Sequence, residues 1–173
     1  MKVRALLLAL SMSALPGAAS TRANPPAQKD YLSSIEADKI RDAETPNERI
    51  TLFLSFADDR LKKLQYELEH PSQTRHEEMI NSLLNAYVGC VDDAADLIQL
   101  GIEKQQNIRK AINLMADRTK EYLAILQKIP TGVPDADLYK DNLEDAKEGT
   151  QDALREAEQA KKNVAPPPVR RKK

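Results

Sequence analysis

Residues 98–112, IQLGIEKQQNIRKAI, decide whether the middle of this chain is one long helix or two shorter ones. They lie at the centre of a stretch, Thr74 to Ile129, that contains no proline. Apolar residues recur through the stretch in steps of four and three, which places them on one seam of a helix. The seam consists of Ile80, Leu84, Tyr87, Val91, Ala94, Ile98, Gly101, Gln105, Ile108, Ile112, Met115, Thr119, Tyr122, Leu126 and Ile129.

The seam keeps its phase through Gly101 and Gln105, and residues 102–106 are good helix formers without turn chemistry. We therefore predict one continuous helix, roughly 80 Å long at 1.5 Å per residue. Thr74 and Glu77 are predicted to form a capping box at its start. The weak point is Gly101, where the seam loses side-chain volume. If the helix breaks there, four segments of about 25 residues would instead form a compact four-helix bundle.

Towards the N-terminus, Thr45-Pro46-Asn47-Glu48 predicts the start of a helix that runs to Glu69, with Thr45 and Glu48 as a capping box. Its apolar surface is broad at the start, so a second element must cover it. We expect this cover to be a short helix over residues 30–43. The apolar side of that short helix consists of Leu32, Ile35 and Ile40. The seam of the longer helix consists of Ile50, Leu54, Ala57, Leu61, Leu64 and Leu68, widened by Leu52, Phe53 and Phe56.

Towards the C-terminus, the turn residues 130–134 separate the long stretch from a last helix, predicted from Asp135 to Asn163. Its apolar stripe is shallow and rich in alanine. It consists of Leu138, Leu143, Ala146, Ala153, Leu154, Ala157 and Ala160. The chain has no Trp, two Phe and few β-branched residues, which argues against a sheet. The predicted fold class is all-α, with elongated antiparallel helical hairpins or a coiled coil built on one long central helix.

The first 23 residues have the three zones of a secretory signal peptide: basic residues, an apolar run and small side chains. Cleavage is expected after Ala19, Ser20 or Ala23, and residues 24–29 would follow as an extended lead. The apolar run is shorter than the about 20 residues that a spanning helix needs. The helical domain then covers residues 30–163, without a transmembrane helix in the mature chain. The prediction is therefore a periplasmic or secreted protein.

The end of the chain, residues 164–173, is a proline-rich basic tail. Removal of residues 1–23 would take away three basic residues and no acidic one, so the net charge of −1 would become about −4. The helical body is therefore acidic and the tail basic. Without interleaved aromatic residues the tail favours an anionic envelope surface over nucleic acid. The residues expected to make that contact are Arg170, Arg171, Lys172 and Lys173.

Three groups of residues have side chains that can form a metal site or act as a reactive group. Glu67 and His70 have the spacing of a di-iron ligand pair, but the chain has only one other histidine and lacks the second pair. A carboxylate cluster, formed by Asp92, Asp93 and Asp96, is expected on an exposed strip of helix that could hold a divalent cation weakly. Cys90, the only cysteine, is expected to be buried, with an intermolecular disulfide as the alternative if it is exposed.

No set of residues completes a catalytic, cofactor or metal site, so none is predicted. We expect an exported, non-enzymatic helical protein that acts as a scaffold, assembly or protein-binding factor in the cell envelope. A partner protein or self-association is expected for any apolar face that two helices leave uncovered. The alternatives are a helix-borne metal-binding protein or enzyme, and a chaperone-like holder.

Overall fold

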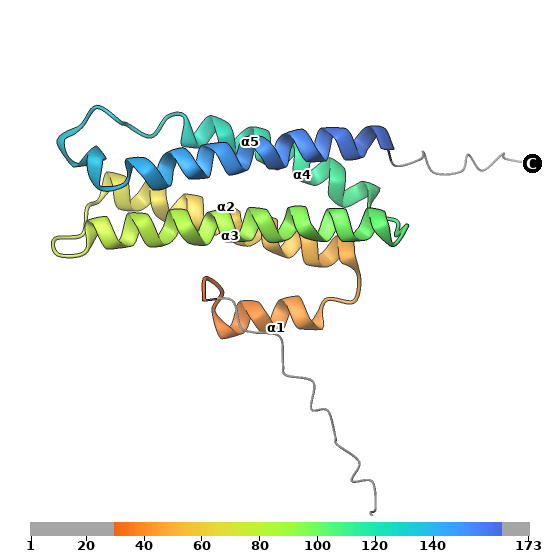
Figure 1. Ribbon diagram of the computed structural model, residues 1–173. Helices are drawn as coiled ribbons and strands as arrows, with labels where there is room; N and C mark the ends of the chain where they lie inside the picture. The colour runs from red at the N-terminus through yellow and green to blue at the C-terminus, as the bar shows by residue number, and fades with distance from the viewer. Residues whose placement is uncertain (1–29, 164–173) are drawn as a thin grey trace, which may run out of the picture.

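The computed structural model describes residues 30–163, and within them it contains helices and no strand. The α-helices are α1 (Ser34–Asp42), α2 (Pro46–Glu69), α3 (His76–Glu103), α4 (Arg109–Leu126) and α5 (Lys140–Asn163), and a short 3-10 helix, η1 (Pro134–Leu138), precedes the last. The predicted all-α class is confirmed. Two antiparallel hairpins, α2–α3 and α4–α5, pack together as a four-helix bundle, and α1 lies outside on the first hairpin (Figure 1).

The prediction of one continuous helix is wrong, and the bundle alternative is the form that the chain adopts. The helix ends at Glu103, and Gln105 takes the left-handed conformation with φ of 52°. Gln106 N–H donates to Gly101 O at 2.8 Å and Gln105 N–H donates to Ile102 O at 3.0 Å. These bonds form a Schellman motif, with glutamine at the position that glycine usually occupies.

Tertiary contacts stabilise the turn that separates α3 from α4. A Cβ on Gly101 would lie 2.7 Å from Ile108 Cδ1, so the glycine makes room for Ile108 to fold back onto α3. Asn47, in the first turn of α2, donates to Asn107 O at 2.7 Å and accepts from Ala111 N at 3.0 Å. A residue of another helix thus satisfies an N–H in the first turn of α4, where no local side chain does so.

The predicted seam residues form the core in spite of the break, since all of them except the exposed Gln105 are buried. At the centre, Tyr87 and Tyr122 meet edge to face with ring centroids 5.6 Å apart. The Tyr122 hydroxyl donates to Leu54 O at 2.8 Å, and the Tyr87 hydroxyl lies 2.6 Å from Thr150 Oγ1. This aromatic pair therefore connects all four helices of the bundle. Burial is the main cause that raises the pKa of both tyrosines.

The sequence predicted both ends of α2 correctly but not the start of α3 or of α5. The predicted helix from Pro46 to Glu69 is found with those bounds, and Thr45 forms the predicted capping box with Glu48. The predicted box of Thr74 is absent, because α3 begins at His76 after an N-cap residue without a side-chain bond. The last helix begins at Lys140 and not at the predicted Asp135, because residues 134–138 form the 3-10 helix η1.

Two apolar residues lie outside the stripes predicted for them. Ile35 of α1 is 67 % exposed, and Leu138 of η1 is 44 % exposed. On α1, the side that faces α2 carries Glu36 and the half-buried Ile40, which are one helical turn apart. Ile35 points away from that side.

Candidate functional site

A polar cluster lies where α1 and the residues before it pack on the α2–α3 hairpin. Arg60 of α2 donates to Glu36 through both terminal nitrogens, at 2.6 and 2.7 Å. Its Nη2 also donates to Tyr31 O at 3.1 Å. The Tyr31 hydroxyl donates to the carboxylate of Asp93 on α3. Only 8 % of Arg60 and 7 % of Asp93 is exposed, so the cluster is covered by α1 and the residues from Asp30 to Ser33.

The two carboxylates of this cluster titrate in opposite directions from their ordinary values. The hydrogen bonds from Arg60 are the largest cause that lowers the pKa of Glu36 to about 2. Burial, followed by repulsion from Asp96, raises the pKa of Asp93 to about 6. The cluster thus contains a carboxylate that is charged at all ordinary pH values and one that titrates near neutrality.

The expectation that Asp92, Asp93 and Asp96 share one exposed strip is wrong for Asp93. Asp92 and Asp96 are exposed, whereas Asp93 is buried and accepts a hydrogen bond from the Tyr31 hydroxyl. Gly89, one turn earlier on α3, leaves room for the ring of Tyr31, because a Cβ at that position would lie 2.7 Å from Tyr31 Cε1. No periodicity in the sequence signals this contact, since Tyr31 precedes α1 and lies far from Asp93 in the chain.

Glu67 and His70, which have the spacing of a di-iron ligand pair, do not come together. Glu67 accepts from Ser72 N at 2.8 Å and Ser72 Oγ at 2.9 Å, and it pairs with His76 Nδ1 at 2.8 Å. These contacts organise the α2–α3 loop, and the bond from Ser72 N is the largest cause that lowers the pKa of Glu67. His70 is exposed and stacks on Tyr66 instead, with ring centroids 4.4 Å apart.

The Ser72, Glu67 and His76 contacts do not activate a nucleophile. A catalytic serine needs a base to accept its proton, with an acid behind the base. Here the Ser72 hydroxyl donates directly to the carboxylate of Glu67, and the imidazole of His76 binds the same carboxylate. Across residues 30–163, no three His, Cys, Asp or Glu side chains are grouped to hold a metal ion. Cys90 is fully buried, as predicted for a small apolar thiol.

An open groove lies on the same side of the hairpin as α1, next to the α2–α3 loop. Its volume is about 330 Å³, and its lining consists of Lys62, Lys63, Tyr66, Glu67, Met79 and Leu83. The rim carries exposed apolar surface, because 63 % of Tyr66 and 38 % of Met79 is accessible. Sequence reasoning missed this site, although the exposed position of Tyr66 off the predicted seam was a usable signal.

The open groove lies on the same side of the hairpin as the seat of α1. Glu67 follows Arg60 by seven residues, and Met79 precedes Asp93 by fourteen, so each pair shares one face of its helix. Figure 1 shows that the hairpin extends beyond α1 towards the α2–α3 loop. The open groove and the seat of α1 therefore lie on the same face of the α2–α3 hairpin, and α1 packs only on the part of that face around Arg60 and Asp93.

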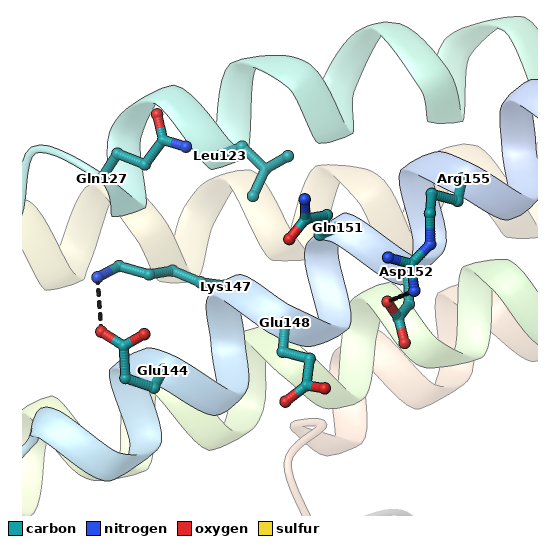
Figure 2. A pocket seen from close by; sticks show the side chains of 8 residues that line it. All are labelled: Leu123, Gln127, Glu144, Lys147, Glu148, Gln151, Asp152 and Arg155. Carbon is teal, nitrogen blue, oxygen red and sulfur yellow. Dashed lines mark hydrogen bonds and ion pairs between the residues drawn. The ribbon is translucent and has the colours of Figure 1, made fainter.

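A second groove lies between α4 and α5 and has a volume of about 420 Å³ (Figure 2). Its charged side chains pair with each other along α5. Lys147 Nζ lies 2.9 Å from Glu144 Oε1, and Arg155 pairs with Asp152. Such i, i+3 pairs are those of a solvated helix face, and the lining offers one aliphatic residue, Leu123. We therefore favour the open groove on the α2–α3 hairpin as the candidate site.

Other predicted sites lie outside the described residues. They include the signal peptide with its cleavage points, the extended lead of residues 24–29, and the basic tail with Arg170, Arg171, Lys172 and Lys173. No described helix combines the length and the apolar character required to span a membrane. No protein-family model, curated protein or solved structure matches the chain.

Proposed function

We propose that this protein is a non-enzymatic binding protein that holds an acidic amphipathic helix of a partner protein in the open groove. In this role it would serve as a scaffold or assembly factor, and its predicted signal peptide would place it in the cell envelope. The observation that carries the proposal is the uncovered apolar rim of Tyr66 and Met79, on the same face of the hairpin as the seat in which α1 lies.

The charges around the groove favour an acidic occupant. Lys62 and Lys63 are exposed at its edge. Lys63 pairs with Asp59 at 2.7 Å, whereas Lys62 makes no ion pair with any described residue. The chain itself provides a precedent, because α1 packs on the same face of the hairpin as a short helix and places the carboxylate of Glu36 on Arg60. A partner helix in line with α1 would place its acidic residues on the two lysines and its apolar residues on Tyr66 and Met79.

The polar groups nearest the groove support a binding role over an enzymatic one. Arg60 and Glu36 satisfy each other, and Glu67 accepts bonds from the loop residues Ser72 and His76. These groups are engaged in holding helices and loops in place. Helix-in-groove recognition needs no chemistry beyond apolar anchors and complementary charges at the edge.

Site-specific photo-crosslinking in intact cells tests the proposal. A crosslinking residue replaces Met79, and a matched control replaces Leu138, which is 44 % exposed on η1. The expected result is one partner captured at position 79 and not at 138, through an acidic helical segment. As a synthetic peptide, that segment should bind the Lys62→Glu protein about 10-fold more weakly than the wild type. Lys128→Glu is the matched control, because Lys128 lies on the other hairpin, and it should reduce the affinity less.

Other outcomes would overturn the proposal. Capture of a second copy of this chain would make the groove a dimer interface. Capture of many unrelated protein segments at position 79 would favour the chaperone-like holder. Stoichiometric metal in protein purified without a metal-affinity tag, together with no capture at position 79, would favour the metal-binding alternative.

A further inference from the structure

We infer that residues 30–43, named here the strap, form a displaceable cover that occupies part of the partner's groove in the free protein. The strap consists of α1 with the residues on either side of it. In this inference a partner helix long enough to run the whole groove takes the place of the strap and brings its own carboxylate to Arg60. The inference rests on the proposed function, because it describes how that same groove is regulated.

The strap is attached mainly by polar contacts. None of the residues of α1 is buried, and Ile35 is 67 % exposed. Its apolar attachment consists of Leu32, which is buried, and of Tyr31 and Ile40, which are half-buried. By contrast, α2 to α5 each bury a continuous row of side chains. An element with so little buried apolar area opens at a lower free energy than the bundle to which it is attached.

Four polar contacts, made by three side chains of the hairpin, hold the strap in place. Arg60 binds Glu36 with two nitrogens and Tyr31 O with one of them, and the Tyr31 hydroxyl binds Asp93. At the other end, Arg49 donates to Ala43 O at 3.1 and 3.2 Å. Each of these contacts joins one side chain of the hairpin to one group of the strap. They can therefore be broken without unfolding α2 or α3.

The same contacts define what must replace the strap. When it leaves, Arg60 keeps Asp59, at 3.0 Å, as its ion-pair partner among the described residues. A guanidinium in a groove requires charge-assisted partners, so a replacement helix that supplies a carboxylate there is preferred over one that does not. The small residue Gly89 leaves a recess that accepts an aromatic ring, as Tyr31 shows. The strap thus specifies a helix with an acidic residue and an aromatic residue near its start.

Hydrogen exchange of the intact protein tests whether the strap opens. Amides of residues 38–42 are expected to exchange faster than those of α2 and α3 by about 100-fold or more, as for a locally opening segment. Tyr31→Phe and Glu36→Gln should each raise exchange in the strap by about 10-fold and leave α2 to α5 unchanged. Asp38→Asn is the matched control, since Asp38 is an exposed acid of α1 that pairs only with Arg41 among described residues. Equal protection of α1 and α3 would overturn the inference.

Exchange of the strap in trans supplies the second readout. The probe is a fluorescent peptide of residues 30–44, followed by anisotropy. It should bind the Glu36→Gln protein about 10-fold more tightly than the wild type, whose own strap competes. A peptide that carries Glu36→Gln itself should bind neither protein. Equal affinity for both proteins would overturn the inference. Neither measurement requires the partner, so a failed capture at Met79 with a mobile strap rejects the proposed function alone.

Discussion

Replacing Gln105 by glycine should make this protein more stable, although glycine inside a helix normally makes it less stable. Gln105 has a φ of 52°, in the left-handed region, and its side chain is exposed. That conformation costs a residue with a Cβ about 1–2 kcal/mol. Glycine avoids this cost but loses about 0.5–1 kcal/mol through the greater freedom of the unfolded chain. The net gain is therefore about 0–1.5 kcal/mol, and its central value of about 0.75 kcal/mol corresponds to a rise in melting temperature of roughly 2 °C.

The sign of the change decides between the two folds considered for this chain. In a continuous helix, Gln105→Gly would lower stability by about 1 kcal/mol, as at other helix interiors. The assay is urea unfolding followed by circular dichroism, with the slope of the transition required to stay constant. Gln106→Gly is the matched control, because Gln106 has the same side chain one residue later without a positive φ. Stability lowered equally by both substitutions would refute the Schellman turn and favour the long helix.

Four further predictions follow from the same structure and sequence. Ile112→Ala should lower the free energy of unfolding by about 2–5 kcal/mol, because Ile112 is fully buried. Ile35→Ala should lower it by less than about 0.5 kcal/mol, because Ile35 is exposed. Equal effects of the two substitutions in urea unfolding would contradict the core described here. Stability should fall as the pH rises from about 4 to about 6, because folded Asp93 keeps its proton up to its pKa of about 6 while the unfolded chain releases it near 4. Asp93→Asn should remove that part of the pH dependence, and an unchanged profile would show that Asp93 does not cause it. Residues 1–30 should export a fused reporter, and an uncut fusion retained in the cytoplasm would exclude the signal peptide. Deletion of residues 164–173 should change stability by less than about 0.5 kcal/mol and weaken binding to anionic vesicles at low salt; equal vesicle binding by both forms would exclude the tail as the contact.

The sequence by itself determined the helical class, the start and end of α2, and the identity of most of the core residues. These features depend on interactions between residues a few positions apart. A capping box joins Thr45 to Glu48, and a seam in steps of four and three needs only helical geometry. The seam identified the buried residues correctly even across the break, because the helices on both sides turn the same apolar row towards one core.

Only the tertiary structure decided where the long stretch breaks and which polar residues meet. Residues 102–106 favour a helix locally, but Ile108 packs on Gly101, and Asn47 of another helix binds the turn and α4. The cluster beneath the strap likewise joins Tyr31 to Asp93, 62 residues away. No periodicity signals such contacts, because each depends on the space that other helices leave. Local propensities differ by only tenths of a kcal/mol per residue, so burial of one large side chain outweighs them and sets the path of the chain.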